Sequence, residues 1–282
     1  MPHLEIAPGE TIYYEHDQPT SSDKTFVFVN ALTGNTGMWQ ADAIGPVLRA
    51  AGHGTLCYNF RGQADTTFAD GTPLTPTTIV SDIATLVDTL RPQGPILVGL
   101  SIGGLFAAQA HLAGTRGIGL VLINTLRKPT QRLAWISNAM VELAKTGGGR
   151  LLMMANMPVI ASPELIEKSW DTSFTGEPFE AMDPKDGLFR LMQGSLETDW
   201  DFAYESLDVP VLLMTGMYDR LFRIGADVAE LKALVEEHEI AALIIGMPFN
   251  MDGTEGPRCQ SVRQFAEAEV AEIPANIAVL RR

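Results

Sequence analysis

Short apolar runs alternate along this chain with helical stretches, and the alternation limits the folds that it can adopt. Seven runs read as strands, at residues 11–16, 25–31, 55–60, 96–101, 119–124, 209–216 and 240–246. Most are nearly continuous in Val, Ile and Leu, as expected for strands that are covered on both faces. Between two of them, residues 76–91 carry apolar side chains at helical spacing: Ile79, Ile83, Leu86 and Leu90. This order predicts an α/β fold with a parallel sheet and right-handed crossovers.

One long interval, residues 126–206, interrupts the alternation because it contains no convincing strand. It holds helical pieces rich in Met and Trp, with turn residues at 146–150 and 183–187. We therefore predict a core made of residues 1–125 and 207–282 with a helical insertion at 126–206. The length of 282 residues and the 46% hydrophobic content fit one α/β domain with such an insertion.

Net charge, cysteine count and the lack of long apolar runs exclude some classes of partner and predict the cellular compartment. The net charge of −14 repels nucleic acid phosphates and anionic membranes, so we expect neither as a main partner. Cys57 and Cys259 are too few and too far apart for a disulfide scaffold or a metal cluster, and they suit a reduced cytoplasm. The first ten residues do not resemble a secretory signal, and no apolar run reaches the roughly 18 residues of a membrane span. We expect a cytoplasmic protein without a metal or organic cofactor, either monomeric or homodimeric.

The motif with the clearest chemistry is Gly-Leu-Ser-Ile-Gly-Gly at residues 99–104. It follows an apolar strand and opens a helical stretch, which is the setting of a nucleophile elbow. Gly99 and Gly103 would allow the strand and the helix to approach where a Cβ atom would clash. Ser101 would then sit at the tip of the turn, and the free N–H groups of the helix N-terminus would face a developing oxyanion. A glycine-rich turn with a solvent-facing serine is the alternative.

The motif at residues 99–104 and the segments around it make the chain resemble the α/β-hydrolase superfamily along nearly the whole sequence. Within that superfamily, the chain is most similar to the 3-oxoadipate enol-lactonase and esterase branch. Residues 27–39 are similar to the loop that usually carries His-Gly in that family, although Asn30-Ala31 stands there. Residues 57–66 resemble a structural turn of the family, with departures at Asn59, Ala64 and Asp65. The resemblance implies a mostly parallel eight-stranded sheet flanked by helices, with 126–206 as a lid over the serine. It also implies an oxyanion hole formed by the backbone N–H groups of Leu32 and Ile102.

The same resemblance places the acid and the base of a catalytic triad. Asp219 follows the strand at 209–216, where the family carries the acid that orients a histidine. The family's histidine commonly precedes a Glu and a Pro, which are Glu255 and Pro257 here, and the usual offset lands on Asn250. An asparagine cannot accept and return a proton near neutral pH. Asn250 is therefore predicted to hold the general-base position without acting as a base.

None of the five histidines replaces the missing base on sequence grounds. They are more plausible as structural or exposed residues, and His238 is the one to test first: His3, His16, His53, His111 and His238. Two accounts of the chain remain open. It is either a hydrolase whose histidine has been replaced, or a natural protein that binds a ligand or needs an oxyanion hole with little proton transfer. The retained serine and acid favour the first account.

The lid sequence suggests where a substrate would bind. The candidates for an adaptable apolar pocket wall are Met153, Met154, Met157, Met182 and Met192, with Trp135 and Trp170, although more than half of them are expected simply to pack the lid onto the core. Four cationic residues of the lid would either receive a substrate carboxylate or be solvated, and we favour solvation: Arg127, Lys128, Arg132 and Arg190. The resulting hypothesis is a serine hydrolase of a small-molecule carboxylic ester or lactone, acting through an acyl-enzyme. A non-catalytic ligand-binding protein of the same fold and an acyltransferase are the alternatives.

Overall fold

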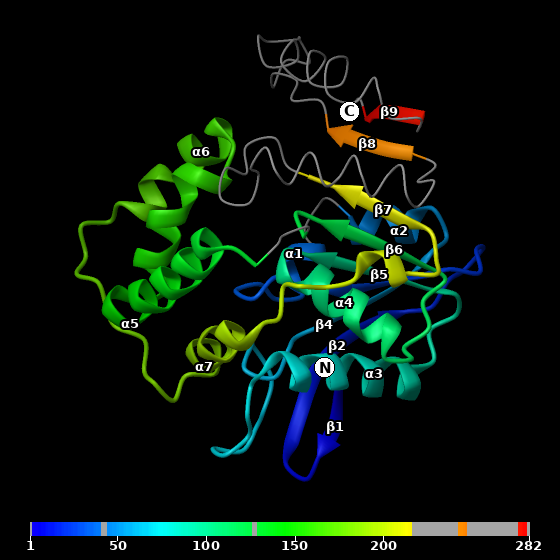
Figure 1. The fold of residues 1–282 in the computed structure, drawn as a ribbon, viewed down its shortest axis with the longest axis horizontal. Helices are drawn as coiled ribbons and strands as arrows, with labels where there is room; N and C mark the ends of the chain where they lie inside the picture. The colour runs from blue at the N-terminus through cyan, green and yellow to red at the C-terminus, as the bar shows by residue number, and fades with distance from the viewer. Residues whose placement is uncertain (1, 41–43, 126–128, 216–241, 247–275, 281–282) are drawn as a thin grey trace.

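The computed structural model describes residues 2–40, 44–125, 129–215, 242–246 and 276–280, the last two ranges by their backbone only (Figure 1). Asp219, Asn250 and Cys259 lie outside these ranges. All seven predicted strands are confirmed within a few residues of their expected bounds. In the part of the chain that the structure describes, no helix is long and apolar enough to cross a membrane.

Among the described residues, seven strands form one sheet in the order β1-β2-β4-β3-β5-β6-β7. β1 pairs antiparallel with β2, and β2 with β4, whereas all the other neighbours are parallel. The strands are β1 (His3–Ala7), β2 (Glu10–Asp17), β3 (Thr25–Val29), β4 (Gly54–Tyr58), β5 (Pro95–Leu100), β6 (Gly119–Ile123) and β7 (Val211–Met214). The mostly parallel sheet agrees with the prediction.

The expected count of eight strands in one sheet is not confirmed by the described residues. β8 (Ala242–Gly246) and β9 (Asn276–Leu280) form a separate parallel pair, which lies beyond β7 in Figure 1. β1 and β9 were not predicted from the sequence. β1 includes the polar residues His3 and Glu5, and the apolar run of β9 is only the four residues 277–280, so neither shows the longer apolar run that marked the other strands.

Helices cover both faces of the large sheet, and the alternation of side chains along β3 shows how. Val27 and Val29 pack in a core cluster with residues of α3 (Pro76–Leu90) and α4 (Ile102–Leu112). Phe26 and Phe28 point to the opposite face, which is covered by α1 (Gly37–Gln40) and α2 (Gly45–Ala50). Since successive side chains of a strand alternate between faces, apolar residues at every position require helices on both sides.

Three helices fill the interval between β6 and β7, and they stand to one side of the sheet in Figure 1. They are α5 (Gln131–Ile160), α6 (Pro163–Ser173) and α7 (Gly187–Gly194), followed by the short 3-10 helices η1 (Ser195–Glu197) and η2 (Tyr204–Ser206). The turn predicted at 146–150 is a kink in α5, where Gly148 has a φ of +68°. A Cβ atom there would lie 2.3 Å from the carbonyl oxygen of Glu180, so only glycine fits this bend.

Helix α7 is anchored directly to the core. The backbones of Gly62 and Gly187 approach so closely that a Cβ atom on Gly62 would lie 2.7 Å from the Gly187 carbonyl oxygen. Arg190 donates a hydrogen bond of 2.5 Å to the Thr72 carbonyl oxygen, and its guanidinium lies 5.0 Å from the centre of the Phe68 ring. Arg190 is thus engaged by the core, which was neither of the two alternatives considered from the sequence.

The burial of Cys57 leads to a prediction about its reactivity. Cys57 lies in β4 with no exposed surface, and burial raises the pKa of its thiol to about 12. Because the thiolate is the reactive form, we expect Cys57 in a Cys259→Ser variant to resist an aromatic disulfide reagent at pH 8. The same variant should react with one equivalent of reagent after unfolding in guanidinium chloride. Rapid labelling of the folded variant would contradict the buried position.

Candidate active site

Ser101 occupies the tip of a sharp turn between β5 and α4. Its φ of +60° is rare for a residue with a side chain and corresponds to roughly 1–3 kcal/mol of strain. The Ser101 N–H donates to the Ile123 carbonyl oxygen at 2.8 Å, and the Gly104 N–H donates to the Ser101 carbonyl oxygen at 3.1 Å. These bonds hold the serine in a conformation that the chain would not adopt alone. The serine therefore has the backbone geometry of a nucleophile elbow.

The glycines beside Ser101 make this turn possible, since each stands where a Cβ atom would overlap a neighbour. A Cβ on Gly99 would lie 2.3 Å from the Gly104 Cα, and one on Gly103 would lie 2.2 Å from the Asn30 carbonyl oxygen. Gly104 faces Thr125, whose hydroxyl oxygen would be 1.9 Å from an added Cβ. The predicted role of Gly99 and Gly103 matches these approaches, whereas Gly104 was not singled out from the sequence.

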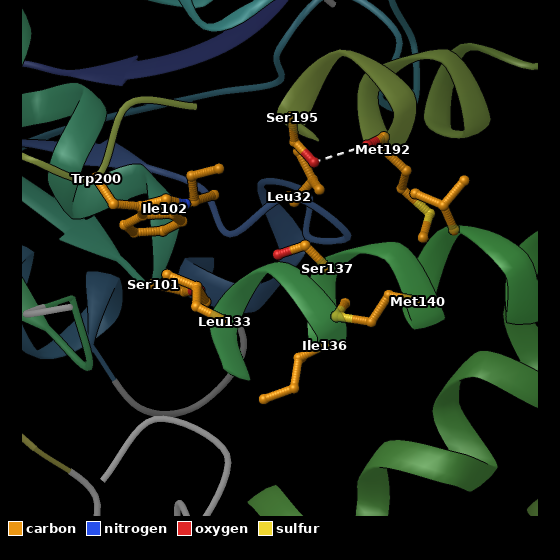
Figure 2. A pocket seen from close by; sticks show the side chains of 11 residues that line it. Leu32, Ser101, Ile102, Leu133, Ile136, Ser137, Met140, Met192, Ser195 and Trp200 are labelled. Carbon is orange, nitrogen blue, oxygen red and sulfur yellow. Dashed lines mark hydrogen bonds between the residues drawn. The ribbon is translucent and has the colours of Figure 1, made fainter. Parts of the chain in front are cut away.

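A pocket of about 60 Å³ opens beside Ser101, at the carboxyl ends of β3 and β5. Ser101, Ile102 and Leu32 line its core side, and Figure 2 shows Ser137 and Met140 of α5 among the residues around it. The other lining residues come from α5 and from the segment of α7 to Trp200: Leu133, Ile136, Val141, Met192, Ser195 and Trp200. The structure thus brings together the predicted nucleophile and both predicted oxyanion residues.

A larger space of about 380 Å³ adjoins this pocket at the start of α5. The two share four lining residues, namely Leu133, Ser137, Ser195 and Trp200. The Ser195 hydroxyl donates to the Met192 carbonyl oxygen at 2.7 Å, which is drawn in Figure 2. Among the described residues, no Asp, Glu, Lys, Arg or His lines either space. The surroundings of Ser101 are therefore mainly apolar, with hydroxyl and amide groups towards the larger space.

Of the predicted pocket-wall residues, Met192 lines this pocket, whereas Trp135, Met153 and Met154 do not. Trp135 is 80% exposed and Met153 is 45% exposed, and neither of them nor Met154 is among the pocket's lining residues. Ile136 and Met140, one helical turn apart on α5, line it instead. The spacing of four residues was visible in the sequence, but the side of α5 that faces Ser101 depends on how the helix packs.

The predicted acid and base positions, Asp219 and Asn250, lie outside the described residues, as does His238. Four histidines are described, and none of them lines either space. His111 is buried and contacts the carboxylate of Asp208 at 2.8 Å, so it has a structural partner. In the sequence range that the structure describes, no group of three or more His, Cys, Asp or Glu residues could hold a metal ion.

Comparison with known proteins agrees with this arrangement of strand, serine and helix. A model described as "Alpha/beta hydrolase family" matches residues 26–254, which is most of the chain. The chain belongs to the α/β hydrolase family. The resemblance inferred from the elbow and from the loop after β3 is thereby confirmed.

Solved structures with esterase and lactonase names share the fold of this α/β hydrolase. An α/β hydrolase from a Medee basin deep-sea metagenome library has a TM-score of 0.70 at 23% identity, covering 86% of this chain and 88% of its own. An esterase from Exiguobacterium antarcticum has a TM-score of 0.66 at 18% identity, and the match covers 97% of this chain and 99% of the esterase. The enol-lactonase from Burkholderia xenovorans has a TM-score of 0.61 at 19% identity, and the match covers 99% of this chain and 91% of the enol-lactonase.

Curated relatives give a second and shorter likeness. A putative pre-16S rRNA nuclease from Ruegeria pomeroyi is 57% identical over 44 residues, which are 16% of this chain and 29% of that protein. One from Rhizobium meliloti is 49% identical over 57 residues, which are 20% of this chain and 34% of that protein. The chain therefore spans about a third of the length of these relatives, and the likeness concerns one segment only.

Proposed function

We propose that this α/β hydrolase cleaves a carboxylic ester or lactone with Ser101 as the nucleophile. The observation that carries the proposal is the strained serine at the end of β5, which opens onto the same pocket as Leu32 and Ile102. Esterase and enol-lactonase names among the structural neighbours agree with it. The helices α5 and α7 would act as the lid, because their residues form the wall opposite Ser101.

The proposed reaction follows from the position of each group. The Ser101 Oγ would attack the carbonyl carbon, and the backbone N–H groups of Leu32 and Ile102 would receive the negative charge that develops on the carbonyl oxygen. Because Asn250 cannot carry the proton, solvent water would take it from the Ser101 hydroxyl and protonate the leaving oxygen. Breaking the ester C–O bond would then release the alcohol and leave an acyl group on Ser101, which a second water would hydrolyse to the acid. Asp219 is the proposed orienting acid, and Asn250 is the proposed occupant of the base position.

The pocket lining favours a neutral substrate. Leu133, Ile136 and Met140 offer an acyl group apolar contacts, and no described residue of the two spaces offers a charge to a carboxylate. Burying a carboxylate without a partner costs several kcal/mol, which outweighs what hydroxyl groups at the margin can return. A neutral ester therefore fits this site better than a lactone or an ester that carries its own carboxylate.

We expect p-nitrophenyl butyrate to be cleaved at least about 100-fold more efficiently, by kcat/KM, than mono-p-nitrophenyl succinate, because only the succinate buries a charge. The two substrates differ only in a terminal methyl or carboxylate group, so each serves as the control for the other. Mass spectrometry of the reacting protein should find the acyl group on the peptide that contains Ser101, and Ser101→Ala should lose it. Equal efficiency, or acylation elsewhere, would contradict the proposed site.

The short likeness to nucleases favours a second candidate, a role in processing RNA. It ranks behind the hydrolase because about two thirds of each nuclease has no counterpart in this chain. The net charge of −14 also disfavours binding to a polyanion. Cleavage of a precursor 16S rRNA by the purified chain, unaffected by Ser101→Ala, would reverse this ranking.

A further inference from the structure

Four polar side chains lie buried behind the loop that carries Leu32: Asn30, Asn59, Gln63 and Trp39. The Trp39 indole N–H donates to the Asn30 Oδ1 at 2.6 Å, and the Asn30 Nδ2 donates to the Tyr58 carbonyl oxygen at 2.8 Å and to the Gln63 Oε1 at 2.9 Å. In a buried network of this kind every bond restricts the next one, so the loop has little freedom.

Gln63 is the member of this network that reaches the loop backbone. Its Nε2 donates to the carbonyl oxygens of Ala31 at 2.9 Å and of Leu32 at 3.0 Å, while its Oε1 accepts from Asn30 and from the Phe60 N–H at 2.9 Å. An amide side chain has two N–H donors and two acceptor positions, and here all four are used. The orientation of the Gln63 amide is therefore fixed by its partners.

The bond to Ala31 has a consequence for the adjacent N–H group. The Ala31 carbonyl and the Leu32 N–H belong to the same peptide unit, which is trans because no described peptide bond is cis. In a trans peptide the C=O and N–H bonds point in opposite directions within one plane. Gln63 and the Gly34 N–H, which donates to the same carbonyl oxygen at 3.0 Å, together hold the carbonyl on one side and so direct the Leu32 N–H to the other side. Leu32 lines the pocket together with Ser101 and Ile102.

We propose that Gln63 is a positioning residue of the oxyanion hole: its Nε2 holds the Ala31–Leu32 peptide, together with the Gly34 N–H, so that the Leu32 N–H faces the oxyanion. The inference rests on the proposed function, since it assumes an oxyanion on a substrate bound to Ser101. A donor that is held in place before the reaction costs no reorganisation when charge develops. The hydrogen bond to the carbonyl also polarises the peptide and strengthens its N–H as a donor.

Asn59 supplies a matched control within the same network. Its Oδ1 accepts from the Thr36 N–H and its Nδ2 donates to the Ala64 carbonyl oxygen, both at 2.8 Å. Asn59 is as buried as Gln63, but no bond joins its side chain to the Ala31–Leu32 peptide in the described contacts. Asn59→Leu should therefore lower the stability of the protein as Gln63→Met does, without misdirecting the Leu32 N–H.

The experiment compares ligands that differ in geometry, so that it does not depend on turnover. Butylboronic acid forms a tetrahedral adduct with a serine hydroxyl and places an oxygen in the oxyanion hole, whereas butyramide stays planar. Their dissociation constants would be measured for the unmodified protein and for Gln63→Met, Gln63→Glu, Asn59→Leu and Ser101→Ala. Thermal unfolding of each variant would report its stability, and kcat and KM on p-nitrophenyl butyrate would be measured alongside.

We expect Gln63→Met to weaken boronate binding about 10- to 100-fold with butyramide affinity unchanged, a smaller loss than the roughly 100- to 1,000-fold effect of deleting an oxyanion donor. For Gln63→Met, KM on p-nitrophenyl butyrate should stay within about twofold of the unmodified protein, whereas kcat should fall by about the same factor as the affinity for the boronate. In Gln63→Glu, a charged carboxylate would face the carbonyl oxygens of Ala31 and Leu32 and could not donate to them, whereas the protonated acid can. Boronate affinity of this variant should therefore rise as the pH falls. Asn59→Leu should keep boronate affinity within about threefold despite a lower Tm.

Equal boronate affinity in Gln63→Met and the unmodified protein would overturn the inference and leave the proposed function standing. Equal losses in Gln63→Met and Asn59→Leu would overturn it too, because they would show a general loosening of the network. If Ser101→Ala binds boronate as tightly as the unmodified protein, the serine is not the nucleophile. In that case the proposed function fails, and the role of Gln63 fails with it.

Discussion

The Asn250→His variant is expected to hydrolyse p-nitrophenyl butyrate about 10²- to 10⁴-fold faster than the unmodified protein, which is the range that a positioned general base contributes. The reason is chemical: a histidine oriented by Asp219 would take the proton from Ser101, whereas the asparagine cannot. Affinity for butyramide should change little, because the groups that bind the substrate are untouched. Steady-state kinetics and a competition assay at pH 7.5 would measure the two quantities.

The double variant Asn250→His, Ser101→Ala is the control, and the gain should vanish in it. The histidine can act only through the Ser101 hydroxyl, so without that hydroxyl the added base has no nucleophile to activate. If Asn250→His folds and gains nothing, residue 250 is not at the base position.

The second large effect that we expect concerns stability, and it comes from a buried ion triad beneath the loop that follows β4. Arg61 donates to both carboxylate oxygens of Asp82, at 2.8 Å and 2.7 Å, and it also bonds to Glu10. The side chains of Arg61, Glu10 and Asp82 are only 13%, 10% and 5% exposed. Removing the cation would leave two carboxylates without a charged partner in a place that water hardly reaches.

Arg61→Met should therefore lower the free energy of unfolding by about 3–5 kcal/mol at pH 7, measured by urea denaturation. Arg116→Met is the matched control, since Arg116 pairs with Asp208 at the surface, with side chains 75% and 61% exposed. That change should cost at most about 1 kcal/mol. Comparable losses in the two variants would show that burial of the triad contributes nothing special. If Arg61→Met does not fold, Arg61→Lys can be measured instead, because it keeps the charge but loses the two-bond contact with Asp82. Its loss in free energy of unfolding should lie between the values expected for Arg116→Met and Arg61→Met.

The free energy of unfolding that Arg61→Met loses is expected to depend on pH. Burial raises the pKa of Asp82, although Arg61 partly offsets it, and removal of Arg61 would raise that pKa more. For an acid whose folded pKa is raised, stability is lost as the pH rises through the folded value. Hydrogen bonds from Thr72, from the Ala69 N–H and from Arg61 lower the pKa of Glu10. Removing Arg61 would therefore raise the pKa of Glu10 back towards its usual value. Both changes make the deficit larger at pH 8 than at pH 5.

Local sequence was enough to predict the elbow and most of the sheet. Gly99, Ser101 and Gly103 lie within five consecutive residues, and the need for a close approach there follows from the turn itself. Apolar runs covered on both faces identify strands without any knowledge of their neighbours. The number of strands was less well defined, because β1 and β9 show no long apolar run and are identified as strands only by their pairing with β2 and β8.

Tertiary structure alone decided the rest of the site. Trp135 and Met140 lie on the same helix, and only the packing of α5 against the core determines that Met140 lines the pocket while Trp135 is 80% exposed. Gln63 reaches Ala31 across 32 residues of sequence, because the parallel pairing of β3 with β4 brings the ends of the two strands together. Sequence patterns report the local preferences of the backbone. Contacts between distant segments depend on strand register and helix rotation, which are set only when the whole core packs.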